Sequence, residues 1–311
     1  MDDQATAGAA AAEQKKAVAA GLICYLIWGG VPLIFQAIHK AGPSAWEIMA
    51  HRVVWGALAA GIYLLVARQW HELKRVLRDP RTLLWLVLSA CLIATNWTLF
   101  VWAVNANRTI ESSLGYYITP LINMAAGALI FRERIGRIGM AAIALAACGV
   151  AAQALALGHP PYVSLVLAFS FGFYGIVRKR APVGAEAGLL VECLVLLVPA
   201  LGLIAWLETH GHGHFFSNPV ATAWLIASGP VTAVPLALFA WAARRMPLSS
   251  IGFLQFLAPT ISFFIGLAEG EAFTPVRAAS FALIWAGACV FIYGAWKKTR
   301  GVRLARAAAA V

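Results

Sequence analysis

Apolar residues occur along this chain in long runs of roughly 20 residues, separated by short polar segments. Within a run the apolar residues do not alternate with polar ones, so the pattern is not that of half-buried β-strands. A run of this length, at about 1.5 Å per residue, crosses the hydrocarbon core of a bilayer as an α-helix. Only helices and closed barrels satisfy their backbone groups in lipid, and the continuous runs favour helices.

The pattern predicts an all-α integral membrane protein with ten transmembrane helices. These cover residues 17–37, 45–67, 82–104, 112–131, 137–157, 161–177, 186–207, 220–243, 249–268 and 277–296. We expect a tail at 1–16, a first group of five helices at 17–157, a second at 161–296, and a basic tail at 297–311.

The basic residues provide a test of this division. When the loops are assigned alternately to two sides, twenty of the 24 Lys and Arg residues fall on one side. Lys40 and Arg108 lie in the opposite loops, Arg277 at a boundary and Arg52 inside a span. Cytoplasmic loops are enriched in Lys and Arg, so the distribution predicts a bacterial inner-membrane protein with both termini in the cytoplasm.

Composition agrees with the membrane assignment. Of the 311 residues, 61% are hydrophobic and 12% are charged, against about 25% charged in soluble domains; the mean hydropathy is +0.78. A net charge of +11 would normally raise nucleic acid as a partner. Because membrane topology accounts for these charges, we expect the lipid bilayer and a small-molecule substrate as partners and no nucleic acid.

The two halves of the chain share a short pattern. Residues 112–116 (SSLGY) precede Pro120, and residues 249–253 (SSIGF) precede Pro259. Each half has five helices, an odd number, so the second half enters the membrane in the opposite orientation. Inverted repeats of this kind are typical of transporters, in which a central cavity opens alternately to each side. The alternative is chance similarity between two Gly/Ser-rich helix starts.

Several motifs together resemble a known family. They are residues 27–32 (IWGGVP), 47–52 (EIMAHR), 96–97 (NW), 102–105 (WAVN), 112–116 (SSLGY) and 252–255 (GFLQ). In this order they resemble the RarD-type branch of the EamA transporters, in the drug/metabolite transporter superfamily. The resemblance covers essentially all ten spans. It implies two inverted five-helix repeats around a central cavity built mainly from helices 1 to 4 and 6 to 9. Superfamily relatives include amino-acid exporters of the YddG type and proteins linked to drug resistance.

Three ionisable residues lie close together near the start of the second predicted helix. Glu47 and His51 are four residues apart and share a face, whereas Arg52 lies about 100° further round. Two interpretations stay open: proton coupling or binding of a substrate carboxylate, and a gate or packing ion pair. Glu111 and Glu271 are the candidate partners for Arg52.

Glu192 lies in the seventh predicted helix, which takes the place of the second helix in the inverted half. It is predicted to be either the matching inner gate residue or a structural carboxylate.

Polar and aromatic residues inside the spans predict a binding site, because lipid penalises them unless the bundle interior accepts them. Aromatic walls with a few amide and hydroxyl groups suit an amphipathic ligand such as an amino acid. The predicted substrate-binding residues are Trp28, Gly30, Asn96, Trp97, Trp102, Tyr116, Tyr117, Asn123, Tyr174 and Gln255.

Four prolines are predicted to bend helices, because proline removes a backbone donor: Pro32, Pro120, Pro235 and Pro259. Helices broken by Gly and Pro in corresponding places of two halves indicate a transport site. The glycines equally fit close helix packing.

No metal or cofactor is expected. The sequence HGHGH at 210–214 could hold a metal weakly, but a flexible solvated loop is the preferred interpretation.

These features favour a secondary transporter that exports amino acids and related small metabolites by alternating access, working as a monomer. The chain has no GxxxxGK[ST] loop, so a gradient or simple facilitated efflux must drive transport. The alternatives are efflux of hydrophobic drugs, an intramembrane enzyme, and a scaffold or sensor. The enzyme is disfavoured, since Asp2, Asp3 and Asp79 are the chain's aspartates and none lies in a span.

Overall fold

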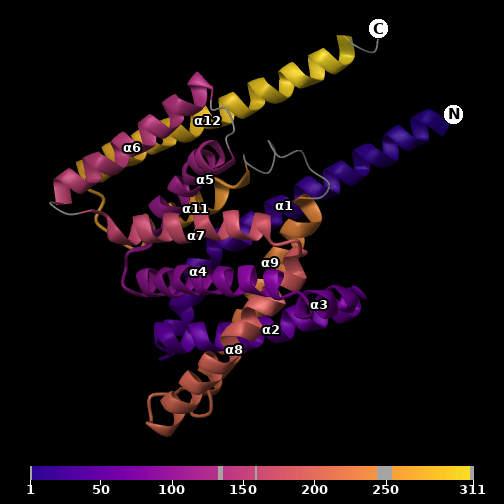
Figure 1. Cartoon of the computed structure of the whole chain (residues 1–311). Helices are drawn as coiled ribbons and strands as arrows, with labels where there is room; N and C mark the ends of the chain where they lie inside the picture. The colour runs from indigo at the N-terminus through magenta and orange to yellow at the C-terminus, as the bar shows by residue number, and fades with distance from the viewer. Residues whose placement is uncertain (1, 132–135, 158–159, 244–253, 309–311) are drawn as a thin grey trace.

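The computed structural model describes residues 2–131, 136–157, 160–243 and 254–308, and over these ranges the chain is helical with short connections (Figure 1). Its elements are α1 (Asp2–Lys40), α2 (Ala45–Val66), α3 (Trp70–Leu77), α4 (Pro80–Asn105), α5 (Thr109–Phe131), α6 (Arg137–Leu157), α7 (Tyr162–Arg180), α8 (Ala185–Thr209), α9 (Pro219–Ala243), α11 (Leu257–Ala268) and α12 (Pro275–Ala308). This confirms the all-α fold class.

The ten predicted spans map in order onto α1, α2, α4, α5, α6, α7, α8, α9, α11 and α12. In the described ranges, six helices are long and apolar enough to cross a membrane: α1, α2, α4, α8, α9 and α12. Shorter apolar helical stretches lie in α6, α7 and α11. The tenth, α5, has 23 residues.

Within the described residues, the short helix α3 is not predicted by the apolar pattern. It connects α2 to α4 and is amphipathic, with Leu73 and Val76 buried and Lys74 and Arg75 exposed. An eight-residue helix with this many charges gives no hydropathy signal, and its helical form depends on packing against the bundle.

Side-chain caps fix the starts of α2 and α4. Ser44 accepts a hydrogen bond from the backbone N–H of Glu47 (3.2 Å) at the start of α2. At the start of α4, Asp79 accepts from the backbone N–H of Arg81, and the hydroxyl of Thr82 donates to the same carboxylate. That hydroxyl favours the charged form and lowers the pKa of Asp79 below its ordinary value. The first cap places Glu47 in the first turn of α2.

The helix contacts are related by exchanging the two groups of five helices. α2 packs on α8, α5 on α11 and α6 on α12, so these equivalent helices pair with each other. The contacts of α9 with α1 and α2 are matched by those of α4 with α7 and α8. Likewise, the contact of α5 with α7 is matched by that of α11 with α1. This exchange is what an inverted repeat requires.

The α6–α12 pair shows the same relation at the level of single residues. Gly149 and Gly287 are each the thirteenth residue of their helix, counted from Arg137 and Pro275. A Cβ on Gly149 would lie 2.8 Å from the Ser280 carbonyl oxygen, and one on Gly287 would lie 2.9 Å from the Ala142 carbonyl oxygen. The two glycines therefore allow the backbones to approach closely.

Both chain ends extend from the same end of the bundle, as Figure 1 shows for α1 and α12. An even number of crossings requires this arrangement. The compartment that contains the two ends stays a prediction from the charge distribution.

The predicted bending prolines divide into three groups. Pro32 and Pro235 lie inside α1 and α9, and their bending role stays a prediction. Pro259 is the third residue of α11, which begins directly after a turn at residues 255–256, so its predicted bending role stays a prediction. Pro120 lies in the part of α5 whose side chains are outside the described residues. The structure adds two interior prolines, Pro199 in α8 and Pro230 in α9.

Candidate functional site

Asn96 is the centre of a polar contact between three helices. Its Nδ2 donates to the carbonyl oxygen of Leu167 (3.0 Å) and to Ser170 Oγ (3.1 Å), both on α7. The hydroxyl of Tyr116, on α5, donates to Asn96 Oδ1 (2.9 Å). Asn96 is only 1% exposed, so this amide is fully used inside the bundle and links α4, α5 and α7.

Arg52 lies in a second cluster, between α1, α2, α4 and α9. Its guanidinium carbon is 4.1 Å from the centroid of the Trp97 ring and 5.2 Å from that of Phe35. Its Nε donates to Thr232 Oγ1 (2.8 Å). The side chain is therefore held by cation–π contacts and one hydroxyl.

Glu192 is bound by three groups from neighbouring helices. Ser89 Oγ on α4 donates to it at 2.6 Å, and the Tyr174 hydroxyl on α7 donates at 3.3 Å. Arg178 Nε lies 3.5 Å from its Oε1. Arg178 also donates to the Gly184 carbonyl (3.1 Å), so α7 is tied to the first turns of α8 by a charged contact.

Arg52 and Glu192 occupy equivalent places in the two halves. Each is the eighth residue of its helix, counted from Ala45 in α2 and Ala185 in α8. α2 and α8 pack on each other, and a Cβ on Gly56 would be 3.7 Å from Cys193 Sγ. The exchange also relates their partners, because Thr232 on α9 and Ser89 on α4 lie on equivalent helices.

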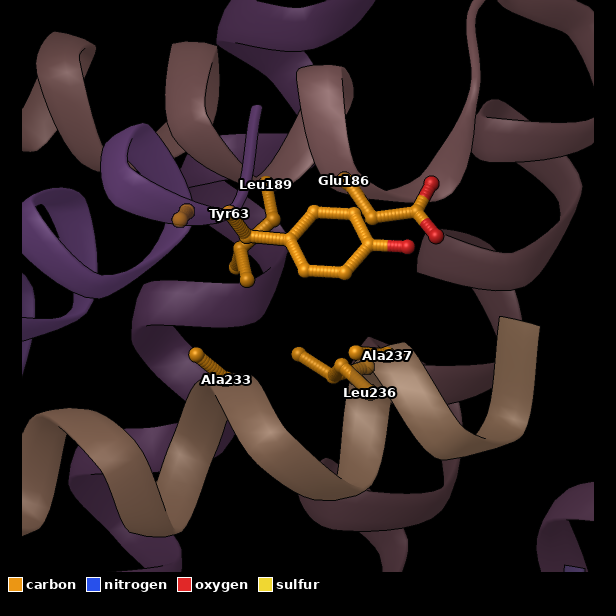
Figure 2. A pocket seen from close by; sticks show the side chains of 7 residues that line it. Tyr63, Glu186, Leu189, Ala233, Leu236 and Ala237 are labelled. Carbon is orange, nitrogen blue, oxygen red and sulfur yellow. The ribbon is translucent and has the colours of Figure 1, made fainter. Parts of the chain in front are cut away.

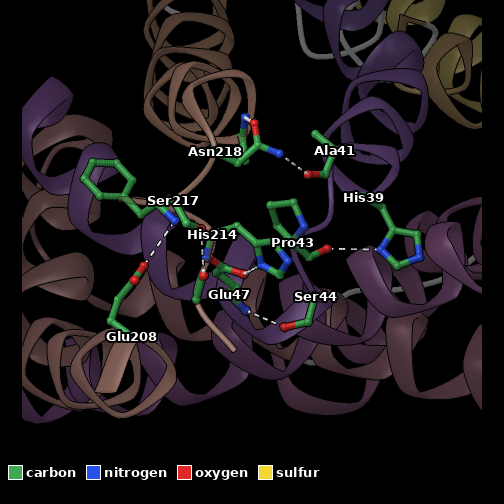
Figure 3. A network of polar contacts seen from close by, with 12 residues as sticks. His39, Ala41, Pro43, Ser44, Glu47, Glu208, His214, Ser217 and Asn218 are labelled. Atoms are coloured by element: carbon green, nitrogen blue, oxygen red, sulfur yellow. Dashed lines mark hydrogen bonds and ion pairs between the residues drawn. The ribbon is translucent and has the colours of Figure 1, made fainter. Parts of the chain in front are cut away.

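A third cluster joins the start of α2 to the connection between α8 and α9 (Figure 3). The Glu47 carboxylate accepts from the backbone N–H of His214 (2.6 Å) and pairs with its Nδ1 (2.9 Å). Next to it, His51 stacks on Phe215 with ring centroids 4.6 Å apart. Asn218 Nδ2 donates to the Ala41 carbonyl (2.8 Å).

These contacts correct the interpretation of HGHGH as a flexible solvated loop at its last residue, whereas residues 210–212 are exposed. His214 is tied to Glu47, whereas His210 stacks on Trp206 with centroids 4.8 Å apart. The signal that could have found this contact is the shared face of Glu47 and His51, which contact the adjacent residues His214 and Phe215.

The candidate acidic partners of Arg52 are bound elsewhere. Arg108 Nη2 lies 2.7 Å from Glu111 on the same helical turn. Glu271 accepts from the backbone N–H groups of Thr109 (2.5 Å) and Ile110 (2.9 Å), so it satisfies the start of α5. The expected pairing with Arg52 is therefore wrong.

Several predicted substrate-binding residues lie away from Asn96. The Tyr117 ring stacks near Phe256 and its hydroxyl contacts Thr260, within a cluster of α5, α11 and α12. Trp102 is 42% exposed, and Arg108 lies over its ring. Adjacent residues of a helix point about 100° apart, which separates Tyr117 from Tyr116.

The remaining predicted residues are less connected. Trp28 is half-buried and packs edge-on against Tyr25 (5.3 Å between centroids). Gly30 and Gln255 are half-buried, and a Cβ on Gly30 would meet nothing within 4 Å. The glycine of close packing is Gly29, whose added Cβ would be 2.7 Å from Ile261. The predicted substrate-binding side chain of Asn123 lies outside the described residues.

The predicted central cavity is not open around Asn96 and Arg52, because neighbouring side chains enclose both. Figure 2 shows a small hollow between α2, α8 and α9, where Tyr63 and Glu186 face Ala233, Leu236 and Ala237. Its volume is about 10 Å³, room for roughly one water molecule. An amino acid does not fit there.

Partners that the sequence did not identify complete these clusters: Ser89, Arg178 and His214. Ser89 gives no sequence signal, since a lone Ser in an apolar run is common in packed helices. The distribution of basic residues places Arg178 in a loop, but its side chain contacts α8. A charged residue at the end of one span, followed by a carboxylate about two turns into the next span, is the pattern that could have indicated it.

Comparisons with known proteins agree with this architecture. The model of the EamA-like transporter family matches residues 15–153. A solved crystal structure with 20% identity has a TM-score of 0.57, covering 91% of this chain and 98% of its own, and shows that the helical fold is shared.

The fold and these relatives define a multi-pass membrane transporter of the drug/metabolite superfamily. Protein RarD of Streptomyces exfoliatus is 41% identical, over 96% of this chain and 95% of the relative. Protein RarD of Escherichia coli K12 is 38% identical, over 92% and 96%. The chain belongs to the EamA-like transporter family, in its RarD branch. The chloramphenicol-sensitive protein RarD of Pseudomonas aeruginosa is 30% identical, over 80% and 85%.

Proposed function

We propose that this transporter exports amino acids and related small metabolites across the bacterial inner membrane by alternating access, with both chain ends in the cytoplasm. The observation that carries the proposal is the pair of buried charged positions, Arg52 and Glu192, at equivalent turns of α2 and α8. Buried charges inside a membrane bundle are costly and are typical of transport pathways.

The two halves give the proposed transport cycle its gates. On one side of the crossing of α2 and α8, Glu192 is held by Ser89 and Arg178. Near the other end of α2, Glu47 is held by His214. We assign the Glu192 cluster to an inner gate and the Glu47–His214 pair to an outer gate, because inverted halves can exchange such contacts as the site opens alternately.

The substrate class follows from the polar and aromatic groups at the centre. Asn96, Tyr116 and Trp97 offer an amide, a hydroxyl and aromatic faces, which suit a small amphipathic molecule. Their roles in substrate binding are part of the proposal. A gradient or facilitated efflux drives the cycle, and a single chain contains both halves, so a monomer suffices.

The test is counterflow with purified protein in liposomes. Vesicles loaded with each of the common amino acids are given the same radiolabelled amino acid outside, and the protein is expected to accelerate exchange for a subset of them. Exchange no faster than in protein-free liposomes for every amino acid refutes the proposal.

A second candidate function is efflux of hydrophobic drugs by the same fold. The name of the Pseudomonas aeruginosa relative, which refers to chloramphenicol, favours it. Cells that overproduce the protein would then accumulate less radiolabelled chloramphenicol than cells with an empty vector. Equal accumulation in the two excludes this alternative.

A further inference from the structure

The charge of Arg52 has no anionic partner in the part of the chain that the structure describes. Its Nε is bound to Thr232, and its Nη1 is enclosed without a hydrogen-bond partner. The side chain is 9% exposed. At the eighth residue of α2, it lies about 10 Å along the helix from its start. A cation at this depth is unfavourable unless an anion pairs with it.

Five carboxylates of the described residues are already bound by other groups. Glu47 binds His214, Glu111 binds Arg108, Glu192 binds Ser89 and Arg178, Glu269 binds Gln36, and Glu271 binds the start of α5. Glu192, at the equivalent position of α8, differs from Arg52 in having an oppositely charged partner. Glu192 receives a cation from α7, whereas Arg52 faces Phe35 on the equivalent helix α1.

The neighbours of Arg52 hold its guanidinium in one orientation. The Trp97 ring covers it at 4.1 Å, and Thr232 Oγ1 accepts from Nε. Thr232 donates its own proton to the Ser228 carbonyl (2.9 Å), so its oxygen is free to accept. A guanidinium held by stacking and at Nε leaves its remaining N–H groups for an incoming anion, and carboxylates match that planar geometry.

We infer that Arg52 binds the carboxylate of the transported molecule, with Trp97 against its apolar part and Thr232 as the positioning residue for the guanidinium. The inference rests on the proposed function and names the chemical group that it recognises. Substrates are then amphipathic acids and zwitterions, and free amines are rejected. The guanidinium is closed off from solvent here, so the carboxylate reaches it when the bundle opens, as alternating access requires.

The first experiment compares three indole compounds in tryptophan counterflow. Tryptophan carries both groups, indole-3-propionate carries only the carboxylate, and tryptamine carries only the amine. Indole-3-propionate is expected to compete with tryptophan, and tryptamine to be at least about tenfold weaker, the ratio that corresponds to one charge-assisted contact. Equal competition by tryptamine overturns the inference.

The second experiment measures binding without transport, by thermal unfolding of the detergent-purified chain with each compound. Indole-3-propionate is expected to raise the melting temperature of the wild type, and tryptamine is not. This result separates the two proposals. If counterflow is absent but a carboxylate compound raises the melting temperature, the export function is refuted and the binding role of Arg52 is kept. If neither carboxylate compound raises the melting temperature, the binding role of Arg52 is overturned.

Variants assign the effect to Arg52. Arg52→Gln is expected to lose the shift with indole-3-propionate, and the control Arg81→Gln, which removes an exposed charge, is expected to keep it. Without ligand, Arg52→Gln is expected to melt no lower than the wild type, because an unpaired buried cation is gone. An Arg52→Gln protein that keeps the shift overturns the inference.

Thr232→Val provides the deciding variant if Arg52→Gln does not fold. It keeps the charge and removes the acceptor for Nε. Affinity for indole-3-propionate is expected to fall about fivefold, as for one lost hydrogen bond. An unchanged affinity overturns the positioning of Arg52 toward the carboxylate.

Discussion

Asn96 shows how one polar side chain organises the centre of this transporter. It contacts Leu167 and Ser170 on α7 and Tyr116 on α5. The sequence predicts a buried amide at this place, because an apolar run tolerates Asn when it has partners. It does not predict that all its hydrogen bonds are used within the protein.

We predict that Asn96→Leu lowers stability by about 1–3 kcal/mol, the cost of leaving buried partners such as Ser170 and Tyr116 unsatisfied. Thermal unfolding in detergent and counterflow in liposomes measure the effect. Thr95→Val is the control, since Thr95 is exposed and its hydroxyl returns to the carbonyl of its own helix. Equal melting temperatures for the two variants contradict the central role of Asn96.

Gly188 lies under the Arg178 side chain. An added Cβ would collide with the Arg178 guanidinium, which passes over this glycine between the Gly184 carbonyl and Glu192. We predict that Gly188→Ala displaces Arg178, leaves Glu192 without its cation and lowers transport several-fold. Gly202→Ala on the same helix has no neighbour within 4 Å and should transport like the wild type. Counterflow rates that do not distinguish the two variants count against the proposed inner gate.

At the scale of elements, α6 and α12 form the most symmetric pair. Gly149 and Gly287 face backbone carbonyls of the partner helix, and the Ser280 hydroxyl donates to the Gly149 carbonyl (2.7 Å). The structure shows that α6 is the main packing partner of α12. Hydropathy gives no information on this choice, because it does not say which neighbour an apolar helix contacts.

We predict that Gly287→Leu separates α6 from α12 and lowers the melting temperature, because backbone oxygen occupies the space of the new side chain. Gly149→Leu should have the same effect, since the two positions are equivalent. Gly202→Leu on α8 serves as the control. If all three variants have the same melting temperature, close packing of α6 on α12 does not stabilise the bundle.

The connection between α8 and α9 is held to α2 through Glu47 and His214. Gly42 has a φ of +118°, and its added Cβ would lie 2.6 Å from the His214 ring. Gly270 also has a positive φ, +81°, but its added Cβ meets nothing within 4 Å. Substitutions at Gly42 and Gly270 therefore distinguish the effect of backbone strain from the effect of losing the His214 contact.

We predict that Gly42→Ala changes counterflow more than Gly270→Ala. Both substitutions place Ala in a left-handed conformation at a cost of about 1–2 kcal/mol, but only Gly42→Ala displaces His214 from Glu47. Glu47→Gln should reproduce the transport change without the backbone strain. Matching rates for the two alanine variants would remove His214 from the proposed outer gate.

At the scale of the whole molecule, ten helices in two exchangeable groups bring equivalent residues to the crossing of α2 and α8. Arg52 and Glu192 lie at the same turn of these helices, yet their partners differ. Glu192 is paired with Arg178, and Arg52 is left with aromatic rings and Thr232. The proposed gates use the near symmetry of the two halves. The binding specificity that we infer comes from the difference between the partners of Arg52 and those of Glu192.

We predict that both chain ends are cytoplasmic. Green fluorescent protein fused after Val311 should be fluorescent, and alkaline phosphatase inserted after Gly211 should be active, since that loop is then periplasmic. Gly211 has open space around it, so the insertion disturbs few contacts. A non-fluorescent fusion together with inactive alkaline phosphatase would show the opposite topology.

The sequence by itself determined the order of the apolar helices, the asymmetry of basic residues and the presence of buried ionisable groups. Lipid imposes its constraints on each segment separately, so local composition is enough to read them. The family motifs added the transport class, which the similar proteins confirm.

Only the tertiary structure decided which side chains pair. Arg52 and Thr232 are 180 residues apart, Glu47 and His214 are 167 apart, and Ser89 and Glu192 are 103 apart. Such contacts depend on the rotation and relative height of packed helices. An apolar surface in lipid leaves both undetermined until small residues and polar partners from the other half select one packing.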